Sequence, residues 1–485
     1  MKASEAVSPL SAAPMPAAAL PPASAGAPPG ATARTLRRGG VTYATTQYLG
    51  MTLGFIGSTL MVRMASPQDV ASYLLLLQAI TAVGLTMQLG LGPAALRFAP
   101  VTRGAGGTAA TALLRRRLFR IQVLLWLAIV PPLALAWPWI ARRLESPELA
   151  KASPLLVAAA VLASFGNLAD NYLRAFRLYT ASALFTHFMA RAFLLAGFVT
   201  LWLLHSREIP WEVLISIYMA AQLAAALGYA ISLRLTTPGE TSEPRAAQPA
   251  PPIREILGAT TAMGLRSAAS VLFVSSDLWV LAWARPHAEV AVYGIASRVL
   301  QIMGAIPGVA NFIIPQEFSV MYTDGRTEEM EALARTASTS VAMISAASLA
   351  ALLLVGRPLI RLAFGPTYVA SWGILLILAV GSFWDTASGS AGFALQMSGN
   401  HNRLLALTAG AAVLNLGLSL ALARLWGGYG VAAATTTTLI LLNLAMVYSA
   451  RRLIGVRTFA YLSPARWWGI LRSLRGHGER PAEGA

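Results

Sequence analysis

The sequence predicts an all-α polytopic membrane protein with about twelve transmembrane helices, in two six-helix parallel-repeat bundles around a central cleft. Three observations lead to this fold class. The composition is strongly apolar, the chain divides into long apolar stretches, and one polar segment separates those stretches into two equal sets.

The composition alone indicates a membrane protein. Hydrophobic residues make up 56% of the 485 residues and charged residues only 12%, and the mean hydropathy is +0.60. Soluble domains carry about 25% charged residues, so a soluble chain of this length could not bury so much apolar surface. The net charge of +17 comes almost entirely from arginine. In a membrane protein this predicts positive cytoplasmic loops and contact with anionic lipid headgroups, not with nucleic acid.

The chain begins with a segment that predicts no fold. Residues 1–33 are rich in Ala, Pro and Ser and lack the apolar core of a signal peptide, so we expect a disordered tail. Twelve apolar spans follow, and Gly and Pro interrupt many of them, as helices that line a cavity tolerate. The predicted spans lie near 41–62, 70–92, 118–140, 154–173, 184–204, 211–233, 256–283, 288–314, 336–356, 369–396, 403–423 and 429–450.

The polar segment 236–254 divides these spans six and six. Most Arg and Lys residues fall in segments that face the cytoplasm if both termini are cytoplasmic, so the positive-inside rule favours that topology. The last segment, with Trp467 and Trp468 among arginines, suits an interfacial helix on the inner leaflet, although an unstructured basic tail stays open. The predicted organisation is a tail at 1–33, an N-terminal bundle at 34–235, a cytoplasmic linker at 236–254, a C-terminal bundle at 255–453 and a basic interfacial tail at 454–485.

An internal repeat supports the two-bundle architecture. The residues 69–73 (DVASY) lie at the start of the second span, and the residues 289–293 (EVAVY) lie at the start of the eighth. Because six spans return the chain to the same side of the membrane, the halves would be parallel repeats about an axis along the membrane normal. Two such bundles leave a cleft between them that can open to either side.

Charged residues inside the spans mark the candidate site. A charge at bilayer depth costs about 2.5–3.5 kcal/mol on insertion scales, so it usually faces a water-filled cavity or a partner. Arg266 and Asp277 share one face of span seven, so both would face one cleft, with Arg266 deeper and Asp277 near the outer mouth. Arg298 lies in span eight, and Arg191 follows His187 in span five. We interpret Arg298, Arg266, Arg191 and Asp277 as substrate-binding residues of a cationic lumen whose guanidinium groups bind phosphate oxygens. Alternatively, these charges pair with one another to lock the bundles or extend to the interface.

Four further residues are candidates for coupling or gating. Asp385, beside Trp384, is a candidate proton or Na⁺ coupling site. Asp170 joins this group, although the nearby Arg174 and Arg177 favour a local ion pair. Arg97, at the end of span two, and Glu317, at the matching place in the second repeat, would close the cytoplasmic side of the cleft if they form a salt bridge.

The sequence carries no catalytic pattern. It has no HExxH, no GxSxG and no glycine loop that would hold a phosphate before a lysine. The chain lacks cysteine, which excludes disulfides and thiolate metal sites, and its five histidines lack ligand spacing. We therefore expect no enzyme, no bound metal and no cofactor, and we leave coupling to H⁺ or Na⁺ open.

Several motifs together resemble a known family. The resemblance is carried by the residues 89–100 (LGLGPAALRFAP), 364–368 (FGPTY), 397–403 (MSGNHNR) and 428–435 (GYGVAAAT), by Asn415, and by Asp277 followed by 289–315. The chain resembles the polysaccharide flippases, Wzx-like members of the MOP exporter superfamily, which also contains the MATE exporters and the lipid II flippase MurJ. Arg298 lies where the lipid II flippases place a lumenal arginine, so the resemblance implies an anion-binding role for it.

The resemblance implies a function as well. It implies a flippase that moves undecaprenyl-pyrophosphate-linked oligosaccharide across the bacterial inner membrane by alternating access, with both termini cytoplasmic. The implied partners are this lipid-linked oligosaccharide, membrane lipids and, in the same machinery, a polysaccharide polymerase and a chain-length regulator. The alternatives are a MATE-like small-molecule antiporter, a membrane polymerase or ligase, and a non-transporting assembly partner. Span one holds no charge, which argues against a cation-exporting MATE.

Overall fold

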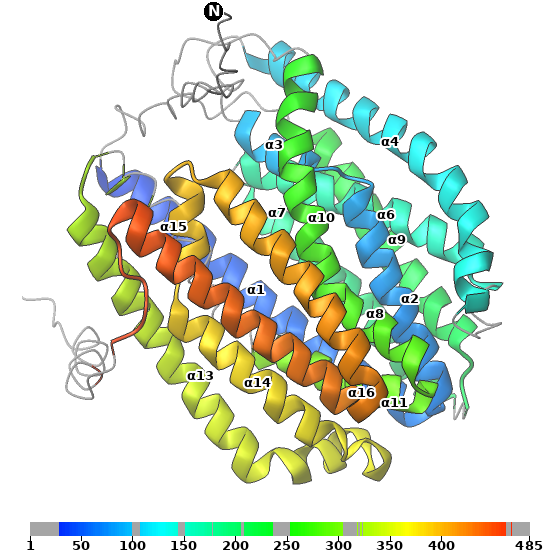
Figure 1. The fold of residues 1–485 in the computed structure, drawn as a ribbon. Coiled ribbons are helices and arrows are strands. Elements are labelled where there is room, and N and C mark those ends of the chain that lie inside the picture. The colour runs from blue at the N-terminus through cyan, green and yellow to red at the C-terminus, as the bar shows by residue number, and fades with distance from the viewer. Residues whose placement is uncertain are drawn as a thin grey trace, which may run out of the picture.

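A computed structural model shows how the chain folds. It describes residues 29–98, 107–143, 151–176, 178–204, 208–235, 253–303, 318, 321–322, 324–461 and 467. The elements of these residues are helical, and the long helices run roughly alongside one another (Figure 1). The expected all-α membrane fold is therefore confirmed.

The helices fall into two sets in chain order. The first set is α1 (Pro29–Met64), α2 (Pro67–Thr86), α3 (Leu91–Phe98), α4 (Gly107–Arg143), α6 (Ser153–Ala175), α7 (Tyr179–Ala183), the π-helix η2 (Leu184–Met189), α8 (Ala190–Leu203) and α9 (Trp211–Leu235). The second set is α10 (Ile253–Ala284), α11 (His287–Met303), α13 (Thr327–Phe364), the 3₁₀ turn η3 (Pro366–Tyr368), α14 (Ser371–Ser388), α15 (Ala391–Met397) and α16 (His401–Ile454). We call these sets the N-terminal and C-terminal bundles.

The helices account for the predicted spans to different degrees. Eight helices of the described chain are long and apolar enough to cross a membrane, or up to nine when the bent pair Ser267–Phe273 and Ser275–Ala284 counts as one span. The long helix α16 covers the last two predicted spans and breaks at Gly427, whose φ is +57°. The span predicted at 288–314 begins as α11 and continues into residues outside the described part. The number twelve stays a prediction.

The segments predicted to lie outside the bundles are described only in part. Helix α1 begins at Pro29 and overlaps the end of the predicted tail 1–33, whose first 28 residues lie outside the described chain. Most of the predicted linker also lies outside it, and α10 begins at Ile253. The residues 455–461 pack onto the C-terminal bundle: Ala460 N donates to the Ala387 carbonyl at 2.8 Å, and Thr458 Oγ1 donates to the Ser388 carbonyl at 2.9 Å. The predicted tail therefore starts with a segment that caps α14.

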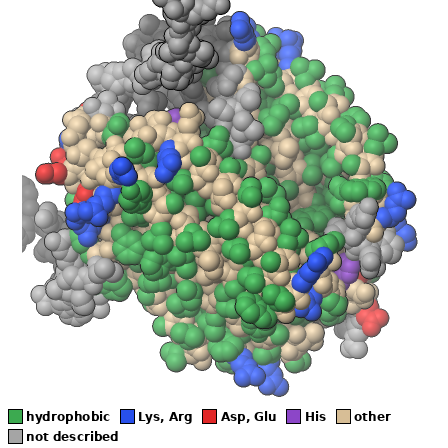
Figure 2. Space-filling model, in the orientation of Figure 1, with side chains coloured by type: hydrophobic (Ala, Val, Ile, Leu, Met, Phe, Trp, Pro, Cys, Tyr) green, Lys and Arg blue, Asp and Glu red, His purple; other side chains and the backbone are tan. Residues whose placement is uncertain are grey.

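The surface has the character of a membrane protein. Figure 2 shows hydrophobic side chains over the middle of one face, whereas Lys and Arg side chains lie around its margins. Many of the large apolar side chains on this molecule are exposed, among them Leu124, Leu135, Leu354 and Leu362. Such a surface, apolar in its middle and basic at its margins, is typical of a protein that lies in a membrane.

The two bundles meet closely between α2 and α11. Leu74 of α2 occupies the space that a side chain at Gly294 of α11 would need, because a Cβ there would lie 2.4 Å from Leu74 Cδ1. Tyr73 and Tyr293, which occupy matching places in the predicted repeat, are both fully buried here. Trp137 of α4 and Trp279 of α10 add an edge-to-face ring contact at 5.9 Å between centroids.

The structure gives the two acids of the predicted repeat the same role. Ser66 caps α2 and accepts a hydrogen bond from Asp69 N at 3.1 Å, while Asp69 Oδ1 accepts from Trp211 N, the first residue of α9, at 3.0 Å. In the C-terminal bundle, Glu289 Oε1 accepts from Gly428 N at 2.7 Å, directly after the break in α16. In each half an acid at the start of one span thus satisfies a backbone N–H at the start of the half's last span, as an internal repeat would produce.

Candidate functional site

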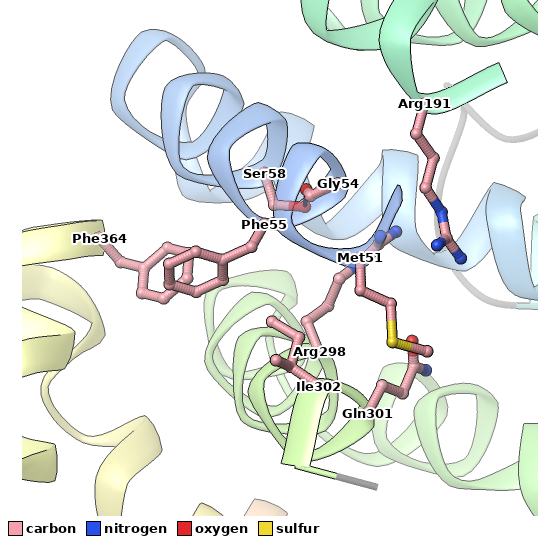
Figure 3. A pocket seen from close by; sticks show the side chains of 9 residues that line it. All are labelled: Met51, Gly54, Phe55, Ser58, Arg191, Arg298, Gln301, Ile302 and Phe364. Carbon is pink, nitrogen blue, oxygen red and sulfur yellow. Dashed lines mark hydrogen bonds between the residues drawn. The ribbon is translucent and has the colours of Figure 1, made fainter. Parts of the chain in front are cut away.

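A pocket lies between the two bundles. Its walls come from α1 and α8 of the N-terminal bundle and from α11 and α13 of the C-terminal bundle, and its empty volume, open space at the mouth included, is about 460 Å³. The residues that line it are Met51, Gly54, Phe55, Ser58, Arg191, Arg298, Gln301, Ile302 and Phe364 (Figure 3). The structure therefore brings Arg191 and Arg298, two of the predicted substrate-binding residues, to one cavity.

The two arginines reach the pocket from opposite bundles. Figure 3 shows Arg191 extending from α8 and Arg298 from α11, both toward the space beside Met51 of α1. Both side chains are half-buried. Within the described part of the chain neither guanidinium forms a salt bridge, and Arg191 Nη1 is buried without a hydrogen-bond partner.

This arrangement favours an anionic ligand. Two guanidinium groups that share a poorly solvated cavity repel each other, and a buried charge without a partner is costly. An anion between them removes both penalties and accepts charge-assisted hydrogen bonds, which guanidinium groups form in pairs with phosphate or carboxylate oxygens. The pocket is therefore a preformed cationic site suited to an anionic group.

A glycine stripe on α1 lets α8 approach the pocket. Gly50, Gly54 and Gly57 lie on one face of α1, at helical spacing. A Cβ at Gly50 would lie 2.0 Å from the His187 carbonyl oxygen, and one at Gly54 would lie 3.4 Å from Arg191 Cδ. The backbone of η2 thus rests directly on α1, and this close approach places Arg191 at the wall of the cavity.

Aromatic rings and a guanidinium join the bundles at the outer end of the pocket, outer being defined by the predicted topology. Phe55 of α1 and Phe364 of α13 meet edge to face at 5.6 Å between centroids. Arg63 Nε donates to the Ala363 carbonyl at 2.9 Å, and Arg63 Nη2 donates to the Leu362 carbonyl. Arg63 therefore caps the last turn of α13, where the helix dipole favours a cation.

Asp277 does not line this pocket. It is buried in the C-terminal bundle, where its carboxylate accepts hydrogen bonds from Tyr293 Oη at 2.8 Å, Thr435 Oγ1 at 2.8 Å and Asn415 Nδ2 at 3.1 Å. These donors come from α11 and from both halves of α16. Asp277 thus joins three helices through a buried polar cluster, which is a different position from the outer mouth of a lumen that the sequence predicts.

The two other predicted site acids whose side chains are described also lie in separate places. Asp170 is buried in the N-terminal bundle and accepts from Ser182 Oγ at 2.5 Å and from Thr186 Oγ1 at 2.7 Å, with Arg174 Nη1 at 3.8 Å. The expected local pair with Arg174 is present. Asp385 of α14 is exposed and accepts from Asn443 Nδ2 at 2.9 Å.

Three predicted residues cannot be placed by their side chains. Arg97 belongs to α3 and Arg266 to α10, but the side chains of both lie outside the described part, as does Glu317 entirely. The Arg97–Glu317 bridge and the place of Arg266 in a lumen stay predictions.

The sequence reasoning missed two kinds of residue. Gln301 and Ser58 supply uncharged polar groups to the pocket. The only signal for Gln301 is its position one turn after Arg298, and the sequence holds no comparable signal for Ser58. The stripe Gly50, Gly54 and Gly57 was visible in the sequence, because small residues at this spacing mark close helix contacts in membranes.

Comparison with solved structures identifies the fold. An inward-facing multidrug resistance MATE family transporter of the MOP superfamily is 18% identical, with 87% of this chain and 96% of that chain covered and a TM-score of 0.65. The lipid II flippase MurJ in an inward closed conformation is 13% identical, with 90% and 91% covered and a TM-score of 0.67. A MOP superfamily transporter from Pyrococcus furiosus, described by the reverse polarity of its binding pocket, is 18% identical, with 86% and 96% covered and a TM-score of 0.63.

The chain therefore has the fold of these membrane transporters, with a pocket between its two bundles and several helices that are long and apolar enough to cross a membrane. The three solved structures are those of two transporters and a flippase. The residues 36–316, more than half of the chain, match the family described as polysaccharide biosynthesis protein. The chain belongs to this family, and the resemblance seen in its motifs is thereby confirmed. A search of the curated proteins finds no match.

Proposed function

We propose that the protein is a flippase that moves undecaprenyl-pyrophosphate-linked oligosaccharide across the bacterial inner membrane by alternating access. The observation that carries this proposal is the pocket in which Arg191 and Arg298 face one cavity without a carboxylate partner among the described residues. Membership of the polysaccharide biosynthesis family supports a saccharide substrate. The solved lipid II flippase with the same fold supports a lipid-linked one.

The charge of the pocket suggests which part of the substrate it binds. Two guanidinium groups from opposite bundles line it, together with the uncharged polar groups of Gln301 and Ser58. The pyrophosphate is the part of the proposed substrate that carries the negative charge these guanidinium groups bind. The anionic group would then bind between Arg191 and Arg298, while the lipid chain stays in the bilayer and Gln301 is available to sugar hydroxyls.

A MATE-like antiporter of small molecules is the alternative with the same fold. An exporter of cationic compounds needs acidic or neutral walls, because like charges raise the cost of binding. The two arginines therefore disfavour a cationic substrate but leave an anionic small molecule open. Only an experiment with the substrate itself distinguishes a flippase from an exporter of anionic small molecules.

Coupling to H⁺ or Na⁺ stays a prediction, and Asp277 and Asp385 are, besides Asp170, the described carboxylates considered for it. Asp277 has the more constrained geometry, because three donors from α11 and α16 converge on it. Asp385 is more accessible and has one donor, Asn443. The inner-membrane location, the cytoplasmic termini and the association with a polymerase and a chain-length regulator are parts of the same proposal.

The test is the sidedness of lipid-linked oligosaccharides in cells that lack this gene. Deletion should leave the head groups on the cytoplasmic face, and the wild-type gene should restore their appearance outside. Arg298→Ala and Arg191→Ala should fail to restore it, whereas Thr200→Val, a change on the same helix as Arg191 but away from the pocket, should restore it. Normal sidedness in a strain without a second flippase gene would overturn the proposal and point to small-molecule export.

A further inference from the structure

The turn that precedes Arg191 has an unusual geometry. The fifth span is built from α7, the π-helical turn η2 and α8, and Arg191 is the second residue of α8. A π-helical turn contains one residue more than an α-helical turn, and such turns are rare and frequently mark functional sites. Because one residue of an α-helix corresponds to a rotation of about 100°, the extra residue decides which way all side chains of α8 point relative to α7.

A hydrogen-bonded cluster holds the turn in place. Ser182 of α7 and Thr186 of η2, one turn apart, both donate to Asp170 Oδ1 of α6, at 2.5 and 2.7 Å. Thr186 also shares a hydrogen bond with the hydroxyl of Tyr229 on α9. Arg174 lies 3.8 Å from the other carboxylate oxygen of Asp170. The π-helical turn is therefore tied to two neighbouring helices by a cluster that does not touch the pocket.

The other side of the turn is fixed by contact with α1. The His187 carbonyl lies so close to Gly50 that no side chain fits between them. Arg191, one α-helical turn after His187, then reaches past Gly54 into the pocket, and its Nη1 is buried without a hydrogen-bond partner in the described chain. Since no described residue accepts a hydrogen bond from that nitrogen, the direction of the side chain depends on the helix that carries it.

We propose that Thr186 is a positioning residue for Arg191: its hydrogen bonds to Asp170 and Tyr229 preserve the π-helical turn, and the turn aims Arg191 at the anionic group of the substrate. The inference rests on the proposed function in that it takes Arg191 to be a ligand of that group. Loss of the Thr186 hydroxyl would let the turn relax toward an α-helical hydrogen-bond pattern, because a π-helical turn is the less favourable geometry. Arg191 would then rotate away from the cavity.

The absence of cysteine from the chain permits a direct test of this orientation. Arg191→Cys gives a single thiol, whose rate of reaction with a small anionic methanethiosulfonate reagent reports whether position 191 faces the pocket. In purified protein in detergent, adding Thr186→Val should slow this reaction by about tenfold or more, adding Thr186→Ser should restore it, and adding Thr200→Val should leave it unchanged. A separate thiol at Ser58→Cys on α1 should react at the same rate with and without the Thr186→Val change, which shows that the pocket itself is intact.

A binding measurement separates this inference from the proposed function. Farnesyl pyrophosphate serves as the probe, with the protein in lipid nanodiscs. Arg191→Ala should weaken its binding by about tenfold or more, as expected for loss of a charge-assisted hydrogen bond, and Thr186→Val should approach that loss while Thr186→Ser does not. If Arg191→Ala binds normally, the anion site of the proposed function fails, whatever the labelling shows.

The positioning role is overturned on its own if position 191 reacts equally fast with and without the Thr186 hydroxyl. Should Thr186→Val not fold, Ser182→Ala removes the other hydroxyl that Asp170 accepts from and provides the same comparison. A normal labelling rate in a folded Ser182→Ala protein would then count against the cluster as the device that sets the turn.

Discussion

Gly50→Ala and Gly54→Ala form a matched pair that tests the packing behind the pocket. Both glycines lie on the same face of α1 and both would gain the same helix propensity, about 1 kcal/mol, on becoming alanine. The two positions differ in the space that is available for an added Cβ. A Cβ at Gly50 would lie 2.0 Å from the His187 carbonyl oxygen, whereas a Cβ at Gly54 would lie 3.4 Å from Arg191 Cδ, an ordinary contact distance.

The expected difference follows from these distances. Relieving the contact at Gly50 requires a shift of about 1 Å or more between two backbones, α1 and η2, and such overpacking typically costs about 1–3 kcal/mol. The propensity gain cancels between the variants, so Gly50→Ala should be less stable than Gly54→Ala by about 1–3 kcal/mol. Because the shift moves the turn before Arg191, Gly50→Ala should also bind an isoprenoid pyrophosphate more weakly.

The assay is reversible unfolding of the purified variants in one detergent, followed by the binding measurement in nanodiscs. Equal stability of the two variants would refute the close approach of η2 to α1. If Gly50→Ala is destabilised but its pyrophosphate affinity is unchanged, the close packing of η2 on α1 is supported. The claim that this packing positions Arg191 would then be wrong.

Three further predictions follow from the described contacts. Asp69→Ala and Glu289→Ala should each lower stability by about 1–3 kcal/mol because each leaves a backbone N–H without its acceptor; chemical denaturation checks this, and a change below about 0.5 kcal/mol in either would contradict the shared role. Asp277→Ala should destabilise more than Asp277→Asn, since the asparagine keeps an oxygen for Tyr293 or Thr435; equal unfolding midpoints would show that the cluster is not structural. Arg63→Ala removes two hydrogen bonds to α13, so a thiol at Ser58→Cys should react faster with an impermeant reagent added outside intact cells; an unchanged rate would exclude Arg63 as an outer contact that limits opening.

The sequence revealed the membrane class and the approximate helix positions because both depend on local composition. An apolar run long enough to span a bilayer has few alternatives, and charges inside such runs are costly enough to be informative. Arg191 and Arg298, which were chosen for their depth in the spans and, for Arg298, also from the family resemblance, lie in one pocket of the structure.

Features that depend on contacts between residues far apart in the sequence were harder to predict. Asp277 was expected at a lumen mouth, yet its partners Asn415 and Thr435 lie far along the chain, and only the fold brings them to it. The extra residue of η2 leaves no mark in the apolar pattern, because adding one residue to a span changes neither its length nor its hydropathy noticeably. The break of α16 at Gly427 was predicted in place as a loop between two spans, whereas the structure makes it a kink held by Glu289.

The most direct test of the cationic pocket as a substrate site is flipping in a purified system. The protein is reconstituted into liposomes with undecaprenyl-pyrophosphate-linked oligosaccharide, and an impermeant oxidant of sugar diols reports the fraction of head groups exposed outside over time. Wild-type protein should expose head groups from the inner leaflet far faster than protein-free liposomes, and Arg298→Ala and Arg191→Ala should each reduce the rate by about tenfold or more. Equal rates for wild-type and both arginine variants would contradict the pocket as the substrate site.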